Sequence, residues 1–230
     1  MENREAKSEL FSQLAVVGKA FGSAKRLELI DLLSQGERTV EALAREAGLG
    51  LSTASAHLQV LKLSNLVSTR REGTRVYYRL AGEDVARLYA AMQAVAREYS
   101  AGVDRALDSY LGGSTPLDDA GVDEISRAEL LERLESGEVV LLDVRPPEEY
   151  AAGHIPGAIS VPFGRLAEDL STIEGLTDDG DIVAYCRGAY CVLAHDAVRL
   201  LRAQGRTARR LEDGLLEWRT TGLPVQEGVA

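Results

Sequence analysis

The two cysteines of the chain, Cys186 and Cys191, lie within one six-residue stretch. The apolar run 182–185 precedes them, and apolar residues at helical spacing follow them. A thiol between a buried strand and a helix N-terminus meets free backbone N–H groups and a partial positive charge, and both favour the thiolate. Because the thiolate is the nucleophilic form, this spacing predicts a reactive Cys186. Two ordinary buried cysteines are the alternative, but the charged Arg187 and the following Gly188 are unusual in a core.

A second thiol in the same loop extends this chemistry. The expected active-site loop consists of Cys186, Arg187, Gly188, Ala189, Tyr190 and Cys191. Cys191 could attack a persulfide or sulfenic acid on Cys186 and close a disulfide, which would make the loop a sensor of sulfane sulfur or redox state. A buried filler role for Cys191 is the alternative. The Cα–Cα distance decides between them, because a disulfide needs about 7 Å or less.

Length and composition restrict the class of protein. A chain of 230 residues suits one large or two small domains. It has no apolar run long enough to cross a bilayer and no signal-peptide core, so we expect a cytoplasmic protein without a membrane partner. In that reducing compartment, a Cys-x4-Cys loop indicates chemistry or redox sensing more often than a structural bridge.

The net charge of −10 is distributed unevenly. Residues 1–111 carry 15 Lys and Arg against 14 Asp and Glu, whereas residues 112–230 carry 11 against 22. Between positions 57 and 79, Glu72 is the only acidic residue among several basic ones, which are Lys62, Arg70, Arg71, Arg75 and Arg79. This basic segment could contact phosphates, and an ordinary solvated face is the alternative.

The small, flexible and acidic stretch 112–121 predicts a linker between two domains, at 1–111 and 122–230. In the first domain, apolar residues recur at helical spacing, and the expected helices are 10–21, 25–33, 40–47 and about 51–64. The period then changes to two over 67–71 and 75–80. Two short helices joined by a Gly-containing turn and followed by a basic hairpin predict a mostly α winged helix-turn-helix with a β-hairpin wing.

One long helix, 83–111, is expected after the wing. Its apolar residues repeat every three or four positions over a length that exceeds the need of one small domain. Such a stripe usually packs on a partner helix, so we expect a homodimer through 83–111. Packing within the same domain is the alternative.

The second helix of the motif is the one that could enter a major groove. Its outward residues are short or carry an amide, which suits base edges, and they are Thr53, Ser55, Ala56, His57 and Gln59. Lys62 and the wing residues Arg70, Arg71 and Arg75 could hold phosphates. Double-stranded operator DNA is therefore the expected partner.

Three segments of the first domain resemble the ArsR/SmtB regulators: 53–61 (TASAHLQVL), 65–67 (NLV) and 70–80 (RREGTRVYYRL). The resemblance covers about residues 8–110. It implies a homodimer that binds operator DNA and releases it on a signal. It also implies that base reading belongs to Ser55, His57 and Gln59, and a wing contact to Arg75.

The chain departs from the metal-sensing members of that family. It has no cysteine before Cys186, and its 83–111 helix has no histidine. Zinc or arsenite sensing by the usual route is therefore not expected, and the chain is expected to use neither a metal nor a cofactor. The signal must come from elsewhere, and the second domain is the candidate.

In the second domain, strands alternate with helices, which predicts an α/β fold with a mostly parallel sheet. The expected strands are 139–142, 158–161, 182–185 and 207–211. Ser126 begins a capping box at the start of a helix, and the helix after the cysteine loop is expected to end at Gly205.

Three segments of this domain resemble the rhodanese fold, and they are 141–150 (LLDVRPPEEY), 153–158 (GHIPGA) and 213–218 (DGLLEW). The resemblance covers roughly residues 122–226. It implies that Cys186 is the catalytic, sulfur-accepting nucleophile and that 187–191 form the loop around it. The fold-signature residues are interpreted as structural, and they are Asp143, Arg145 and His154.

A persulfide anion on Cys186 would be stabilised by backbone N–H groups at the helix N-terminus. The expected donor is a small sulfur compound such as thiosulfate or polysulfide. Arg187 could lower the thiol pKa, bind an anionic donor or face solvent. Val192 stands where a cysteine phosphatase needs arginine, which argues against phosphatase or arsenate reductase activity.

The sequence thus predicts a transcriptional regulator whose rhodanese domain uses a reactive cysteine for sulfur transfer or for sulfane-sulfur or redox sensing. A thiosulfate sulfurtransferase that uses its winged helix for dimerisation or docking is one alternative. A catalytically silent rhodanese module that binds other proteins is another.

Overall fold

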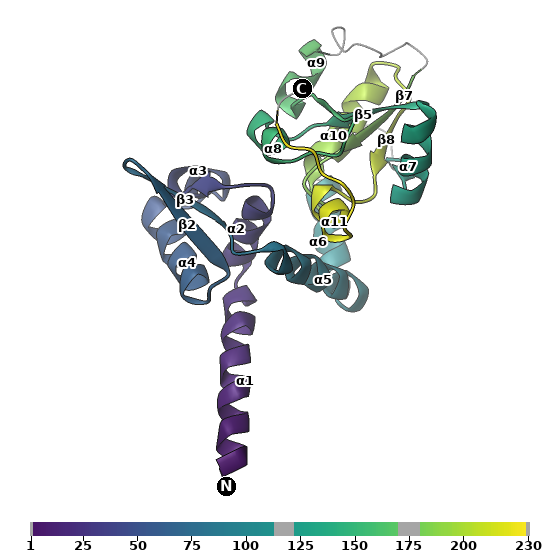
Figure 1. Ribbon diagram of the computed structural model, residues 1–230. Helices are drawn as coiled ribbons and strands as arrows, with labels where there is room; N and C mark the ends of the chain where they lie inside the picture. Colours follow the sequence, from purple (N-terminus) through teal and green to yellow (C-terminus); the bar gives the residue numbers. More distant parts are fainter. Residues whose placement is uncertain (1, 113–121, 170–179, 229–230) are drawn as a thin grey trace. The chain divides into compact units, whose positions relative to one another are not determined.

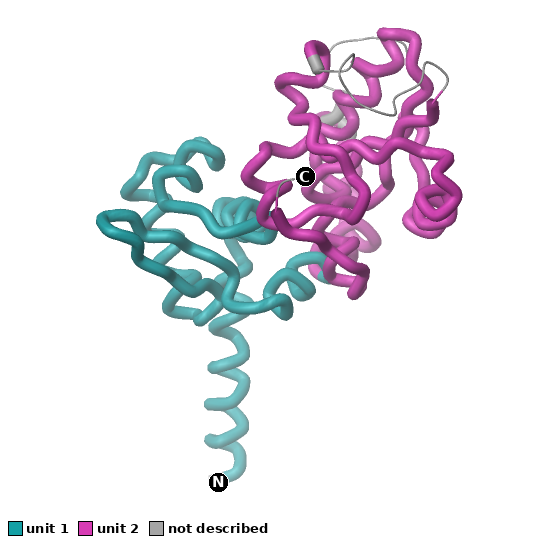
Figure 2. Tube along the Cα trace, turned by 45° about the horizontal axis from the view of Figure 1, so that its top comes forward, with its two compact units in different colours: residues 1–91 teal, residues 92–230 magenta. Residues whose placement is uncertain are grey.

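The computed structural model describes residues 2–112, 122–169 and 180–228 (Figure 1). The chain divides into two compact units, residues 1–91 and 92–230, and each is described by itself (Figure 2). The expected linker lies outside the described residues from position 113 to 121. The expected domain limits therefore stay a prediction.

The first unit is a small helical domain with a three-stranded sheet. Its elements are α1 (Glu2–Phe21), α2 (Ala24–Ser34), β1 (Arg38–Thr39), α3 (Val40–Glu46), α4 (Leu51–Leu63), β2 (Val67–Glu72), β3 (Arg75–Leu80) and the first part of α5 (Glu83–Tyr99). The sheet order is β1–β3–β2, and both pairings are antiparallel. This arrangement confirms the winged helix-turn-helix with a hairpin wing.

The core of this unit lies between the three short helices. Ile30 from α2, Leu43 from α3, and Leu58 and Leu61 from α4 are completely buried. Thr39 caps α3 as expected, because its hydroxyl accepts a hydrogen bond from the Ala42 N–H at 3.3 Å. The core holds α4 with its N-terminal, outward side chains available on the surface of the unit.

The single helix expected at 83–111 is wrong. The chain forms α5, which ends at Tyr99, and a separate α6 (Ala101–Gly112). The Ser100 N–H closes α5 on Ala96 O at 2.9 Å, and the Val103 N–H opens α6 on Ser100 O at 2.8 Å. Serine is a strong N-cap residue and Gly102 a weak helix former, and together they favour a break that the apolar stripe does not reveal.

The second unit adds a parallel sheet to α6. Its further elements are β4 (Glu124–Ile125), α7 (Arg127–Ser136), β5 (Val139–Asp143), α8 (Pro147–Ala152), β6 (Ile159–Ser160), η1 (Phe163–Arg165), α9 (Leu166–Asp169), β7 (Asp181–Tyr185), α10 (Val192–Ala203), β8 (Ala208–Leu211) and α11 (Leu215–Thr220). The five-stranded sheet has the order β4–β8–β7–β5–β6, and each pairing is parallel. The expected α/β fold with a parallel sheet is confirmed.

Alternation along the central strand β7 distributes its side chains between two apolar clusters. Ile182 and Ala184 pack in the cluster that contains the buried face of α10. Val183 and Tyr185 pack in the other cluster, with residues of α7 and α11 that include Trp218. The strand ends at Tyr185, so the next residue in the alternation, Cys186, returns to the α10 side. Among the described residues, no helix combines the length and the apolar character that a bilayer crossing requires.

Candidate functional site

Cys186 and Cys191 form a disulfide that closes the loop between β7 and α10. Their Cα atoms are 6.1 Å apart, within the range that a disulfide requires. Cys186 is 1% exposed and belongs to the aliphatic cluster against α10, whereas Cys191 is half-buried at the N-cap of that helix. The geometry therefore permits the bridge, and it places Cys191 as the more accessible partner.

The first turn of α11 fixes the backbone of the cysteine loop through hydrogen bonds. The N–H groups of Leu215 and Leu216 donate to the carbonyl oxygens of Cys186 at 3.0 Å and Arg187 at 2.9 Å. These are N–H groups of a helix start, which have no partner within their own helix. Gly214 permits this approach, because a Cβ there would lie 2.3 Å from the Gly188 nitrogen.

Arg187 has a carboxylate partner that the sequence does not predict, and its expected roles stay predictions. Its guanidinium forms a bidentate pair with Glu149 of α8, with Nη2 2.6 Å from Oε1 and Nε 3.0 Å from both oxygens. The Glu149 side chain is completely buried, and that of Arg187 is 21% exposed. A planar pair of this kind fixes both side chains and neutralises the charge beside Cys186. The guanidinium is thus committed to a carboxylate in this state of the loop.

The backbone N–H groups of the loop are also engaged. The Cys191 N–H donates to Gly188 O at 3.0 Å, and the Ala189 N–H points to Oε1 of Glu217 at 3.4 Å. The other oxygen of Glu217 accepts from the Gly214 N–H at 3.0 Å, so the glutamate at the third position of α11 satisfies the N–H of the N-cap residue. Burial raises the pKa of Glu217, and its backbone hydrogen bonds partly oppose that rise. The expected nest of free amides is therefore partly occupied by a carboxylate of the chain itself.

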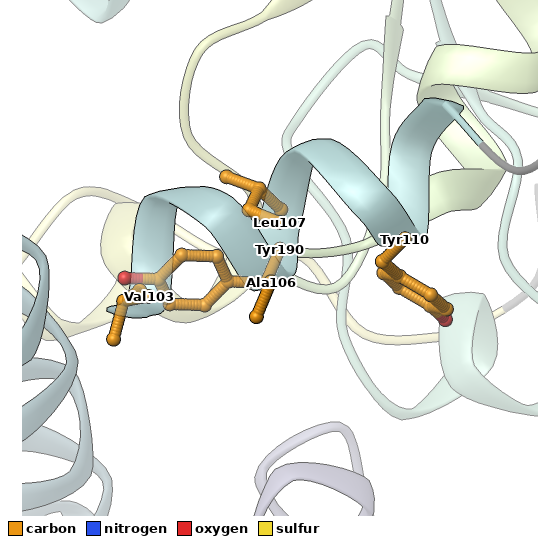
Figure 3. Close-up of a pocket in the computed structure, with 5 residues that line it drawn as sticks. All are labelled: Val103, Ala106, Leu107, Tyr110 and Tyr190. Carbon is orange, nitrogen blue, oxygen red and sulfur yellow. The ribbon is translucent and has the colours of Figure 1, made fainter. Parts of the chain in front are cut away.

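Tyr190 connects the loop to the helices that precede the sheet. Its hydroxyl donates to the main-chain oxygen of Gln93 in α5 at 3.2 Å. Its ring lines a pocket with side chains of α6, which are Val103, Ala106, Leu107 and Tyr110 (Figure 3). Burial raises the pKa of Tyr190. A residue next to Cys191 thus contacts both α5 and α6 within the second unit.

The rhodanese-signature residues have structural positions, as the sequence predicts. Asp143 and Arg145 are fully buried and form an ion pair, which also contacts Gly153 O and the Tyr185 hydroxyl. His154 is 2% exposed and stacks on Tyr150 with ring centroids 3.7 Å apart. These groups hold the loops at one end of the sheet, and their burial separates them from incoming molecules.

The expected DNA-contacting residues lie on α4 and the wing. Thr53, Ala56 and Gln59 are exposed, whereas Ser55 and His57 are half-buried. The Gln59 amide donates to the hydroxyl of Tyr78 at 3.3 Å, so the wing strand β3 holds one of the expected base-reading side chains.

Among the basic residues expected to contact phosphates, some are exposed and others are held by neighbouring side chains. Arg71 and Arg75 are exposed, and Lys62 donates to Thr69 Oγ1 at 3.1 Å. Arg70 pairs with Glu37 and Glu72 at 2.9 and 2.8 Å, and its guanidinium lies 4.5 Å from the Tyr77 ring centroid. Arg70 is therefore an expected phosphate-binding residue whose guanidinium is already paired with carboxylates of the chain.

Sequence reasoning missed Glu149 and Glu217. A signal for both was present, since Glu149, Cys186 and Glu217 each follow the end of one of three adjacent strands, β5, β7 and β8. The carboxyl ends of parallel strands meet at one edge of the sheet, which is where α/β proteins place their sites. Among the described residues, no three His, Cys, Asp or Glu side chains gather as a metal site would require.

Comparison with known proteins gives the family. Residues 23–69 match the family described as bacterial regulatory protein, arsR family, and residues 126–221 match the rhodanese-like domain. The HTH-type transcriptional regulator Rv0324 of Mycobacterium tuberculosis is 58% identical over 224 residues, which cover 97% of this chain and 95% of that protein. The chain belongs to the ArsR family of bacterial regulators. This ArsR-family chain carries a rhodanese-like domain after its winged helix-turn-helix, and it is a DNA-binding regulator of that type.

Other relatives match one half of this ArsR-family chain each. A sulfurtransferase of Allochromatium vinosum is 33% identical over 105 residues, covering 45% of this chain and 94% of that protein. The homodimeric winged helix-turn-helix DNA-binding domain of Mb0332 from Mycobacterium bovis is 58% identical. The match to its solved structure covers 41% of this chain and 87% of the M. bovis chain, with a TM-score of 0.39.

Proposed function

We propose that this regulator changes its affinity for operator DNA with the state of the Cys186–Cys191 pair. The observation that carries the proposal is the disulfide-compatible pair in a loop whose Tyr190 is hydrogen-bonded to α5. The same α5 begins in the winged-helix unit, where Val85, Ala86 and Tyr89 are buried. A change in the loop can therefore act on a helix that is continuous with the DNA-binding unit.

The chemistry of the switch needs a sulfane-sulfur donor and both thiols. The Cys186 thiolate attacks the sulfane sulfur of the donor, and a persulfide forms on Cys186. The rest of the donor leaves as sulfite from thiosulfate or as a shorter polysulfide anion from polysulfide. The Cys191 thiolate then attacks Sγ of Cys186 and expels hydrosulfide, which closes the disulfide. The pair loses two electrons, and the sulfane sulfur gains them. Because the second step removes the persulfide, this pair is suited to report a donor rather than to pass sulfur to an acceptor.

The regulator is proposed to act as a homodimer. Apolar side chains that are more than half exposed lie on α1, at Leu10, Phe11 and Leu14, and on α5, at Val95 and Tyr99. Apolar side chains exposed on helices in this way are typical of a protein interface, and a second copy supplies the matching surface. Sedimentation equilibrium of the full chain should give the mass of a dimer, and a monomer at micromolar concentration would contradict this part of the proposal.

DNA binding and thiol chemistry can be tested separately on the full chain. In a gel shift with DNA from upstream of its own gene, the reduced protein should form a complex that random DNA does not compete away. After polysulfide treatment, the intact mass should show the loss of two hydrogens in the wild type. In Cys191→Ser it should show a gain of one sulfur, and in Cys186→Ser no gain of a stable sulfur at that position.

Two outcomes would contradict the proposal. Failure to bind upstream DNA, together with sustained sulfur transfer to cyanide, would favour a sulfurtransferase whose winged helix serves docking. No mass change with any donor would favour a silent interaction module.

A further inference from the structure

The charges around the cysteine loop are arranged against an anionic donor. Two arginines at the loop backbone are each paired with a carboxylate, while the charge of a third, Arg97 of α5, acts on Tyr190. Arg187 is paired with the buried Glu149, and Arg210, which donates to Ala189 O at 3.3 Å, is paired with Glu124. These pairs reduce the positive charge that Arg187 and Arg210 offer to an anion.

Glu217 adds a negative charge at the position where an anion would need hydrogen-bond donors. Its carboxylate oxygens lie 3.2 and 3.3 Å from the Cβ position of Gly188, so the carboxylate fills the space beside the loop backbone. Oε1 also accepts from the Ala189 N–H. A dianion such as thiosulfate would have to displace this carboxylate or lie against it, and like charges in a partly buried site repel strongly.

The surface on the Tyr190 side of the loop is apolar. Tyr190, the neighbour of Cys191, shares its pocket with Val103, Ala106 and Leu107 of α6 (Figure 3). The surface at Tyr190, the residue before Cys191, is therefore aliphatic and aromatic, which suits a donor without charge.

We infer that the loop selects uncharged, apolar sulfane-sulfur donors and rejects dianionic ones, with Glu217 as the specificity-determining residue. The inference deepens the proposed function, on which it rests, by naming its donor class. With a dialkyl trisulfide, the Cys186 thiolate attacks a terminal sulfur, forms a mixed disulfide and releases an alkyl persulfide anion. The Cys191 thiolate then attacks Sγ of Cys186, releases the alkyl thiolate and closes the disulfide. The trisulfide gains the two electrons that the pair loses.

The experiment measures rates at Cys186 in the full-length, reduced Cys191→Ser background, where Cys186 is the sole thiol. The probes are thiosulfate, read as a gain of one sulfur in the intact mass, and the isosteric pair iodoacetate and iodoacetamide, which differ in charge. Glu217→Gln keeps the shape of the side chain and removes its charge. Glu212→Gln makes the same charge change at an exposed side chain and is the matched control.

Glu217→Gln should raise the thiosulfate rate constant and the iodoacetate-to-iodoacetamide ratio about tenfold, while Glu212→Gln changes either by less than about twofold. Dimethyl trisulfide should close the disulfide in the wild-type pair under conditions where thiosulfate does not. Equal gains in the two variants would overturn the inference. A reduced Cys186 that reacts with none of the probes would overturn both the inference and the reactive thiol of the proposed function.

A measurement on unsubstituted protein covers the case in which Glu217→Gln does not fold. Repulsion between an anion and the site weakens as salt screens it, so the thiosulfate rate should rise with ionic strength while the iodoacetamide rate stays constant. A thiosulfate rate that falls with salt would indicate an attractive site and refute the inference. If oxidation leaves DNA affinity unchanged, the proposed function fails, and these rate ratios still decide the donor class.

Discussion

Gly214→Ala should destabilise the rhodanese-like unit strongly, although alanine is the smallest possible addition. The new Cβ would lie 2.3 Å from the Gly188 nitrogen, 2.4 Å from its Cα and 2.7 Å from the Arg187 carbonyl carbon. All three are backbone atoms, so no side chain can rotate away. The φ angle of Gly214 is −142°, which any residue adopts, and the cost therefore comes from contact alone.

The structure sets the size of the effect. Relief of the overlap requires the loop and the start of α11 to separate, which stretches the hydrogen bonds from Leu215 and Leu216 to the loop carbonyls. Two hydrogen bonds at about 1 kcal/mol each, and overpacking at about 1–3 kcal/mol, give a loss of about 3–5 kcal/mol in the free energy of unfolding.

Urea unfolding followed by tryptophan fluorescence measures this loss. Trp218 is the sole tryptophan of the chain, is 1% exposed and lies in α11 itself. Gly164→Ala is the control, because a Cβ at Gly164 would meet no described atom within 4 Å. The control should cost less than about 1 kcal/mol. If Gly214→Ala unfolds at the same urea concentration as Gly164→Ala, the close approach of the loop to α11 is refuted.

Three further predictions concern the switch, the fold and the charge of the site. Tyr190→Phe should leave disulfide formation intact but lower the ratio of operator affinities between the reduced and oxidised forms, measured by anisotropy. An unchanged ratio would show that the Tyr190 hydroxyl does not couple the loop to α5. Arg145→Ala should cost about 3–5 kcal/mol in urea unfolding, because it leaves the partner carboxylate buried without its counter-ion; a cost below about 1 kcal/mol would contradict that burial. Burial raises the pKa of Glu217, and the Asp213 carboxylate adds to that rise, so acidification neutralises Glu217 before an exposed glutamate. The guanidiniums of Arg187 and Arg210 at the loop stay charged. The iodoacetate-to-iodoacetamide ratio, in which the thiolate fraction cancels, should therefore rise as pH falls, and it should be flat in Glu217→Gln.

Local pattern predicted most of the fold. The change from helical spacing to a period of two located the wing, and Thr39 capped its helix because a threonine side chain reaches the third N–H after it. The apolar run at 182–185 predicted a buried strand, and its alternation assigns Cys186 to a face of the sheet. These features depend on neighbours within a few residues, which sequence reasoning can follow.

The features that sequence reasoning missed depend on distant residues. The partner of Arg187 is 38 positions away, and Glu217 reaches Ala189 across 28 positions. Only the strand order places them together. The break at Ser100 was missed for another reason, since the apolar stripe continues through it and a capping serine is weak evidence alone. The burial of Cys186 beside its partner also required the packed structure.

One anisotropy titration of labelled upstream DNA at fixed salt decides whether the cysteine pair controls DNA affinity. The full chain is used in its dithiol form and in its Cys186–Cys191 disulfide form, each verified by intact mass. The disulfide form should bind at least about tenfold more weakly than the dithiol form, and a reductant should restore the affinity. Equal affinity of the two forms would contradict the proposed function.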